Sequence, residues 1–400
     1  VMAGPGQTGF NALGEILTGE VNPSAKMVDT YVYDLTQTPT WNNFGSMFYD
    51  NMDEFAVDGA VPSFVNYVEG IYVGYKFYET AAAEGLIDYD TTVQYPFGYG
   101  LSYTTFTQEM GPISESNGTI TFDVTVTNTG DVAGKDVIQV YYNPPYTNGG
   151  IEKASANLIA FDKTDMLEPG ASQTLTISFD VEDMASYDTY GAGAYVLEAG
   201  DYAISINSDA HTVIASQTYN VPTTITYGDT SPRSTDAVAA SNQFAFAEGD
   251  VTYLSRANGF DNYAEATAAP TNFTMDEETK ATFYNNSNYD PNEFNNADDV
   301  MPTTGAKNGL KLEDLRGVDY DDPQWDELLD QMTVSEMDTL IAIGGYQTSA
   351  INNFTGKGSI GFPPAVMIAA TGMWIWPMTS ASASARWPTR WACPAGTLPL

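Results

Sequence analysis

The sequence predicts a multidomain protein in which a segment of mixed helix and strand, an all-β segment and a helical segment follow one another. Three observations predict this order: helical spacing of apolar residues over 10–17, strict alternation over 120–127, and helical spacing again after residue 322. With 400 residues, 43% hydrophobic and 13% aromatic, the chain has the length of about two to four domains and enough apolar side chains to bury their cores.

Residues 1–105 combine helix and strand signals. Phe10, Leu13, Ile16 and Leu17 recur on one helical face, and Gly19 follows as a stop signal. The run "GIYVGYKFYET" at 70–80 is aromatic and β-branched, which predicts a strand. Glu69 lies directly before this run, in the same aromatic segment, and would be an acid inside the predicted strand. We expect its side chain to make a buried hydrogen bond to backbone or tyrosine rather than to act in catalysis.

Residues 106–221 predict a two-sheet antiparallel β-sandwich. One face of the run "TITFDVTVTNTG" carries Ile120, Phe122, Val124 and Val126, which we expect to be buried. Asp123 and Thr125 lie on the other face and should be exposed. Further strand-like runs cover 135–143, 156–163, 172–181 and 193–207, separated by turns such as "LEPGAS".

Residues 222–310 are rich in Asn, Asp, Thr, Ala and Ser, with weak periodicity, which predicts a linker. Within it, "VTYLSR" at 251–256 is expected to dock on a neighbouring domain. Residues 311–366 become helical. Asp322 is a good N-cap with Pro323 at the first helical position, and Thr333 with Glu336 forms a capping box for a second helix.

The tail, residues 367–400, breaks from the rest of the chain in composition. It contains no acid but four of the six tryptophans, Trp374, Trp376, Trp387 and Trp391. Exposed tryptophans without partners would form an aggregation-prone patch. We expect limited proteolysis to trim the chain to near Val366. A reading-frame error is one explanation of the tail, and a real, divergent domain is the other.

The formal net charge is −38, from 52 acidic and 14 basic residues. This balance argues against nucleic acid, which requires Lys and Arg to displace counterions, and against an anionic membrane surface. A neutral sugar is compatible with it. A single cysteine, Cys393, rules out an internal disulfide framework.

The start of the chain resembles neither a signal peptide nor a natural start, so we expect a fragment. Localisation stays open, with a cytoplasmic location favoured over secretion.

Two motifs and the sandwich after them carry a resemblance to a known family. "YVEGIYVGYKFYET" at 67–80 and "YPFGYGLSYTTF" at 95–106 resemble glycoside hydrolase family 3, the β-glucosidase family. Residues 3–27 resemble the segment just upstream in that family. "WDELLDQMTVSEMDTLIAIGGYQTSAI" at 325–351 resembles the start of the family's barrel domain, which normally precedes the sandwich.

The resemblance implies a fold and a domain order. Residues 1–105 would be the C-terminal part of the family's α/β sandwich domain, 106–221 a fibronectin type III-like domain, 222–310 a linker, and 311–366 the helical start of a (β/α)8 barrel. The tail at 367–400 would be aberrant. This order is the circularly permuted arrangement known from some bacterial members, which indicates a bacterial source.

The resemblance also explains "YPFGYGLSYTTF", which has five rings and two glycines but no charge. In the family this stretch passes from the α/β sandwich to the fibronectin-like domain. Gly98 and Gly100 would allow tight turns and close backbone approach, and the rings would supply apolar contact area. We therefore expect its role to be architectural.

The activity implied is that of an exo-acting retaining β-glycosidase acting on β-linked oligosaccharides or glycosides. Such enzymes use two carboxylates about 5–5.5 Å apart, a nucleophile and an acid/base. In the family's order the nucleophilic Asp would lie beyond Leu400 and the acid/base Glu before Val1. A sugar-contacting Asp would follow "GFPPAV", where this chain has "MIAATG". We therefore expect no catalytic, cofactor-binding or metal-binding residue in this chain, and no activity of the chain alone.

Other candidate residues favour structural roles. His211, the single histidine, follows a strand-like run and has no partner Ser or Cys motif. "GPGQTG" at 4–9 lacks the Lys-Ser/Thr of a phosphate-binding loop, and Cys/His spacing typical of zinc sites is absent from the sequence. Two alternatives to an enzyme remain open, a non-catalytic carbohydrate-binding module and a structural spacer. The preferred sugar and homo-oligomer formation also remain open.

Overall fold

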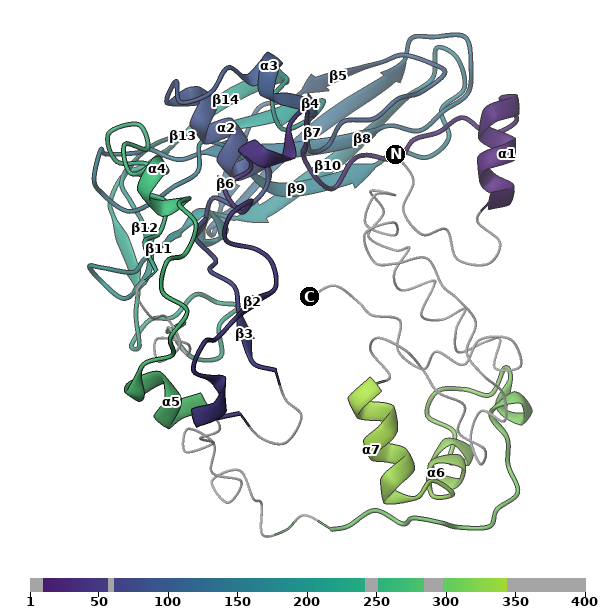
Figure 1. The fold of residues 1–400 in the computed structure, drawn as a ribbon. Coiled ribbons are helices and arrows are strands. Elements are labelled where there is room, and N and C mark those ends of the chain that lie inside the picture. Colours follow the sequence, from purple (N-terminus) through teal and green to yellow (C-terminus); the bar gives the residue numbers. More distant parts are fainter. Residues whose placement is uncertain (1–9, 57–60, 242–250, 284–297, 299, 344–400) are drawn as a thin grey trace. The chain divides into compact units, whose positions relative to one another are not determined.

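The computed structural model describes residues 10–56, 61–241, 251–283, 298 and 300–343 (Figure 1). The chain divides into two units, residues 26–290 and residues 1–25 with 291–400. The sequence motif at 4–9, the part of the predicted barrel start that follows residue 343, and the tail with Cys393 lie outside the described residues.

Two four-stranded antiparallel sheets form the all-β segment of the larger unit. The first has the order β10-β7-β5, with β6 also pairing β7, and the second the order β14-β13-β8-β9. The first consists of β5 (Phe106–Met110), β6 (Ser114–Ser116), β7 (Thr119–Asn128) and β10 (Ser172–Asp180). The second consists of β8 (Val137–Asn143), β9 (Asn157–Lys163), β13 (Gly200–Asn207) and β14 (Val213–Val221).

The alternation predicted for β7 is confirmed by the burial of its side chains. Ile120, Val124 and Val126 are fully buried, and Phe122 is 3% exposed. On the opposite face Asp123 is exposed and Thr125 half-exposed. Inward residues of both sheets form one apolar core, since one cluster contains Ile120, Phe122, Val124, Val126, Ile138, Val140, Ile177, Ile204 and Ile206.

A third, small sheet lies beside these two, with the order β11-β12-β15. Its strands are β11 (Ser186–Asp188), β12 (Ala194–Leu197) and β15 (Ile225–Tyr227). A short 3-10 helix, η3 (Val181–Met184), connects β10 to β11.

The run at 70–80 is not the strand that the sequence predicts, because most of it lies in helix α2 (Tyr75–Ala83). Gly74, with φ of +58°, begins the helix, and Phe77, Tyr78 and Ala81 bury one helical face. Aromatic residues are common in strands because they pack well there, and the same packing is available on this helix face. Ile71 and Val73, just before the helix, are exposed.

Glu69 also differs from its expectation. It lies in a turn rather than a strand, and its side chain is half-buried rather than buried.

Short elements complete residues 26–105. Two two-stranded sheets pair β1 (Tyr31–Val32) with β4 (Val93–Tyr95), and β2 (Met47–Phe48) with β3 (Ser63–Phe64). Helix α3 (Tyr89–Thr92) precedes β4, and the 3-10 helices η1 (Leu35–Gln37) and η2 (Met52–Glu54) precede β2 and β3. Large apolar side chains of this segment are exposed, among them Tyr33, Leu35, Trp41, Phe44, Tyr67 and Leu101.

Residues 251–276, here called the strap, pack against the segment that contains α2. Leu254, Phe260 and Ala266 share an apolar cluster with Tyr72 and Phe77. The strap contains α4 (Tyr263–Ala266), and α5 (Glu277–Phe283) follows it. The docking expected of residues 251–256 is therefore confirmed.

The smaller unit contains helices that the sequence predicts. Helix α1 spans Phe10–Thr18, and Gly19 has a positive φ of 78° at its end. After η5 (Leu312–Leu315), helix α6 spans Gln324–Leu329, with the Gln324 amide donating to Asp322 at 2.9 Å. Helix α7 spans Val334–Ile343, and the capping box between Thr333 and Glu336 is formed. Leu315, Leu328 and Met332 form its small core.

Candidate functional site

The seam between the sandwich and residues 67–100 begins with a very close approach at Gly98. A Cβ atom on Gly98 would lie 2.0 Å from Oε1 of Gln139 on β8, and the φ of Gly98 is +81°. Gln139 Nε2 donates to the Gly98 carbonyl at 3.0 Å and to the Ser208 carbonyl at 2.9 Å. The Tyr141 hydroxyl donates to Gln139 Oε1 at 2.9 Å. Glycine is required here by both backbone conformation and space.

Aromatic rings fill the seam beside Gly98. Phe97 stacks on Tyr75 of α2 with ring centroids 4.5 Å apart, and Tyr75 meets Tyr141 of β8 edge-on at 6.0 Å. The Tyr75 hydroxyl also accepts a hydrogen bond from the Leu158 amide of β9 at 2.9 Å. Burial raises the pKa of Tyr75 to about 12, so the hydroxyl stays protonated. The architectural role expected for "YPFGYGLSYTTF" is consistent with these contacts.

The strap contacts the segment containing α2 through rings and backbone. Phe260 meets Tyr72 edge-on at 5.0 Å, and Tyr263 stacks on Phe77 at 5.8 Å. The Leu254 amide donates to the Val68 carbonyl at 2.8 Å. Farther along, Asn42, Asn43 and Asn51 donate to the carbonyls of Thr267, Ala268 and Met275.

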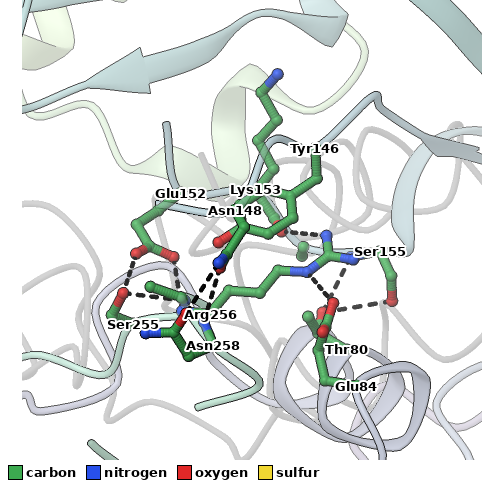
Figure 2. A network of polar contacts seen from close by, with 12 residues as sticks. Thr80, Glu84, Tyr146, Asn148, Glu152, Lys153, Ser155, Ser255, Arg256 and Asn258 are labelled. Carbon is green, nitrogen blue, oxygen red and sulfur yellow. Dashed lines mark hydrogen bonds and ion pairs between the residues drawn. The ribbon is translucent and has the colours of Figure 1, made fainter. Parts of the chain in front are cut away.

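Arg256 connects the strap to both sides of the seam (Figure 2). Its Nε donates to Glu84 Oε1, just after α2, at 2.7 Å, and Nη1 donates to the Lys153 carbonyl of the β8–β9 loop at 3.0 Å. The guanidinium lies over the Tyr146 ring, 4.1 Å from its centroid. Arg256 is 9% exposed. A planar, permanently charged fork suits this site because it serves several acceptors and an aromatic face at once.

Glu152 is the second centre of this network. Its carboxylate accepts from Ser255 Oγ at 2.5 Å, from the Arg256 amide at 2.9 Å, and from the Tyr72 hydroxyl. Burial, and then Glu152, raise the pKa of Tyr72 far above its ordinary value, so this hydroxyl remains a donor. The carboxylate therefore fixes the strap backbone against Tyr72.

Two further contacts close the network. Asn148 Nδ2 donates to Asn258 Oδ1 at 2.8 Å, and the Asn258 amide donates back to Asn148 Oδ1 at 2.7 Å, as Figure 2 shows. Lys153 has a buried side chain, and its Nζ donates to the Pro145 carbonyl at 2.8 Å and pairs with Glu198.

The contacts of this network hold separate segments of the chain together. Glu84 and Glu152 both accept hydrogen bonds from Arg256, and Glu198 pairs with Lys153. A carboxylate nucleophile or acid must instead reach a substrate. The network positions the strap. Apart from the docking of residues 251–256, the sequence does not predict this network, because its members are isolated residues of distant segments.

His211 lies in the turn between β13 and β14, with its ring 43% exposed. Its Nδ1 is 2.9 Å from Glu79 Oε2 on α2, and its ring stacks on Tyr89 at 3.6 Å. The structure thus places the single histidine in a contact between segments, in keeping with the structural role expected of it.

Within the described ranges, His, Cys, Asp and Glu side chains form no group suited to holding a metal ion. None of the helices in the described part of the chain is long and apolar enough to cross a bilayer.

Comparison with known proteins gives a family match within the sandwich and relatives that cover more of the chain. Residues 136–210 match the Fibronectin type III-like domain family. The chain is 33% identical over 287 residues to β-glucosidase A of Butyrivibrio fibrisolvens, covering 67% of this chain and 32% of that protein. It is 38% identical over 208 residues to a β-glucosidase of Ruminococcus albus, covering 51% and 19%. The chain is a relative of the β-glucosidases.

The resemblance to glycoside hydrolase family 3 is thereby confirmed. The β-glucosidase-like chain spans about a third or less of the length of the relatives that it matches. Among solved structures, it is similar to a β-glucosidase from Paenibacillus barengoltzii, with a TM-score of 0.47 and 34% identity, covering 55% of this chain and 23% of that one.

Proposed function

We propose that this chain is part of an exo-acting retaining β-glycosidase, β-glucosidase-like, that hydrolyses β-linked oligosaccharides or glycosides. The observation that carries the proposal is the 33% identity over 287 residues to a β-glucosidase. Outward positions of the sandwich strand β7 are threonines and Asp123 rather than a row of aromatic rings. A carbohydrate-binding module built on that face is therefore not favoured.

The proposed domain order follows the family resemblance. Residues 1–105 are the end of an α/β sandwich domain, 106–221 the fibronectin type III-like domain, 222–310 a connection that includes the strap, and 311–366 the start of a barrel. Residues 367–400 are left outside this scheme. The order is circularly permuted relative to most of the family. Within the larger unit, the strap packs along residues 42–84.

The catalytic carboxylates are proposed to come from sequence outside this chain. The partly buried carboxylates of the seam support this, since Glu84, Glu152 and Glu198 are occupied by Arg256, Ser255 and Lys153. In the complete protein one carboxylate would attack the anomeric carbon and a second would protonate the leaving oxygen. Water would then release the sugar from the covalent intermediate with retained configuration. The contribution of this chain would be to position the domains that carry these groups.

The test compares the complete protein with the purified 400-residue chain on nitrophenyl glycosides. The panel includes β-glucoside, β-xyloside and α-L-arabinopyranoside, because one relative, from Bifidobacterium breve, is an exo-α-(1→6)-L-arabinopyranosidase. The complete protein should hydrolyse at least one of them, and NMR should show the retained anomer first.

The chain alone should fall short by several orders of magnitude, as does an enzyme without its catalytic carboxylate. An inactive complete protein would contradict the proposed activity. Ordinary turnover by the 400-residue chain would contradict the proposed location of the carboxylates.

A further inference from the structure

The turn between β13 and β14, residues 208–212, presses against α2 and α3 at a second place along the seam. The Ala210 amide donates to the Phe97 carbonyl at 2.8 Å, which connects the turn directly to the "YPFGYGLSYTTF" stretch. Asp209 Oδ1 accepts from the amides of His211 and Thr212 at 3.0 and 2.8 Å. Asp209 therefore fixes the conformation of the turn, and the neighbouring Ala210 attaches the turn to Phe97.

His211 and Glu79 form the side-chain part of this attachment. Glu79 is 8% exposed, and its Oε2 lies 2.9 Å from His211 Nδ1. The imidazole stacks almost parallel on Tyr89 of α3, with 3.6 Å between ring centroids and 8° between planes. The stack fixes the ring so that Nδ1 points at the carboxylate.

The ionisable groups that act on the Glu79 carboxylate come from every element around it. They are Tyr89 of α3, and Asp209 and His211 of the turn, while Tyr75 of α2 and Tyr141 of β8 are coupled to it from farther away. Burial and the charge of Asp209 raise the pKa of the Glu79 carboxyl, and Tyr89 and His211 oppose the rise. Of these groups, His211 is the one that can carry a positive charge.

We propose that Glu79 and His211 form a proton-dependent latch, which attaches the sandwich to α2 more tightly when the pair holds a proton than when it has lost it. With one proton in the pair, the buried carboxylate either is neutral or faces an imidazolium. Without it, a bare carboxylate remains buried beside a neutral ring, which costs free energy.

The sign of the effect follows from the raised pKa of the Glu79 carboxyl. A carboxyl whose folded pKa is raised stabilises the contact at low pH and loses that contribution as the pH rises through the folded pKa. The turn should therefore open more readily at pH 8 than at pH 5.5, independently of the proposed enzymatic function.

The test measures hydrogen exchange of the Ala210 amide by NMR in the full chain, corrected for the intrinsic exchange rate at each pH. We expect its protection factor to be about threefold to tenfold higher at pH 5.5 than at pH 8. This range corresponds to a contact whose strength lies between that of an exposed ion pair and that of a buried one. In E79Q this ratio should fall to about one. In H211Q protection at pH 5.5 should be lower than in the wild type.

The matched control is E84Q, at the residue just after the same helix, because its partner is the guanidinium of Arg256 rather than an imidazole. It should keep the wild-type ratio at Ala210. The same ratio in wild type and E79Q would overturn the latch and leave a purely structural contact. If E79Q does not fold, H211Q decides: unchanged protection at pH 5.5 would overturn the proposal.

Discussion

Arg256 Nε donates to Glu84 Oε1 at 2.7 Å, joining two residues 172 positions apart in the sequence. The same side chain also contacts the β8–β9 loop through the Lys153 carbonyl and the Tyr146 ring. One residue of the strap thus contacts both walls of the seam.

Replacement of Arg256 by methionine should destabilise the larger unit by about 2–3 kcal/mol. This value lies between about 0–1 kcal/mol for exposed pairs and 3–5 kcal/mol for broken buried pairs, since Glu84 keeps some exposure. Urea unfolding measures the loss. K280M is the control, because the acids paired with Lys280 are exposed, and it should cost less than about 1 kcal/mol. Equal costs for both variants would show that the strap does not depend on Arg256.

Replacement of Gly98 by alanine should cost at least about 2 kcal/mol more than the same change at Gly118. Both residues have positive φ, +81° and +84°, so both variants carry a backbone cost of about 1–2 kcal/mol. At Gly98 the new Cβ would also lie 2.0 Å from Gln139 Oε1, whereas nothing lies within 4 Å at Gly118. Thermal unfolding of both variants gives the comparison. Similar losses would mean that the approach of Gly98 to Gln139 is not tight.

Ile120→Ala should destabilise the sandwich by about 2–5 kcal/mol, because the side chain is fully buried in its core. Thr125→Ala in the same strand should cost less than about 1 kcal/mol, because it removes one exposed hydroxyl contact with Thr174. Chemical unfolding followed by tyrosine fluorescence measures both. A reversed order would contradict the assignment of inner and outer faces.

The stability of the larger unit should rise with pH between about 8 and 10 more steeply in the wild type than in K163M. Burial, and then the charges of Lys135 and Lys26, lower the pKa of Lys163 to about 8. An unfolded lysine titrates near 10.4, so in this window the unfolded state binds more protons, and deprotonation favours the fold. Unfolding free energies at pH 7, 8.5 and 10 measure the slope. K311M, at an exposed lysine, should keep the wild-type slope.

Sequence reasoning predicts best where one local period determines burial. The alternation in β7 has period two with one buried face, and the caps at Asp322 and Thr333 are local signals. Helix α2 differs from the strand that the sequence predicts, because its aromatic residues suit either packing. Strand β14 was not foreseen because most of its residues are at least partly exposed and no apolar alternation marks it.

The polar network could not be predicted, because its members are far apart in the sequence. Glu152 and Ser255 are separated by 103 positions, and Glu79 and His211 by 132. A single acid or base in such a segment looks like any solvated side chain until the fold brings its partner to it. The sequence predicts that the backbone approaches a neighbour closely at Gly98. It does not predict that this neighbour is Gln139.

Hydrogen exchange of the strap amides tests most directly that the strap is a structural part of the seam. The amides of Leu254, Arg256 and Gly259 donate to Val68, Glu152 and the Arg256 carbonyl. We predict that they exchange at least about 100-fold more slowly than an unstructured chain, and that R256M removes most of this protection. Exchange of these three amides at the rate of an unstructured chain would contradict the account.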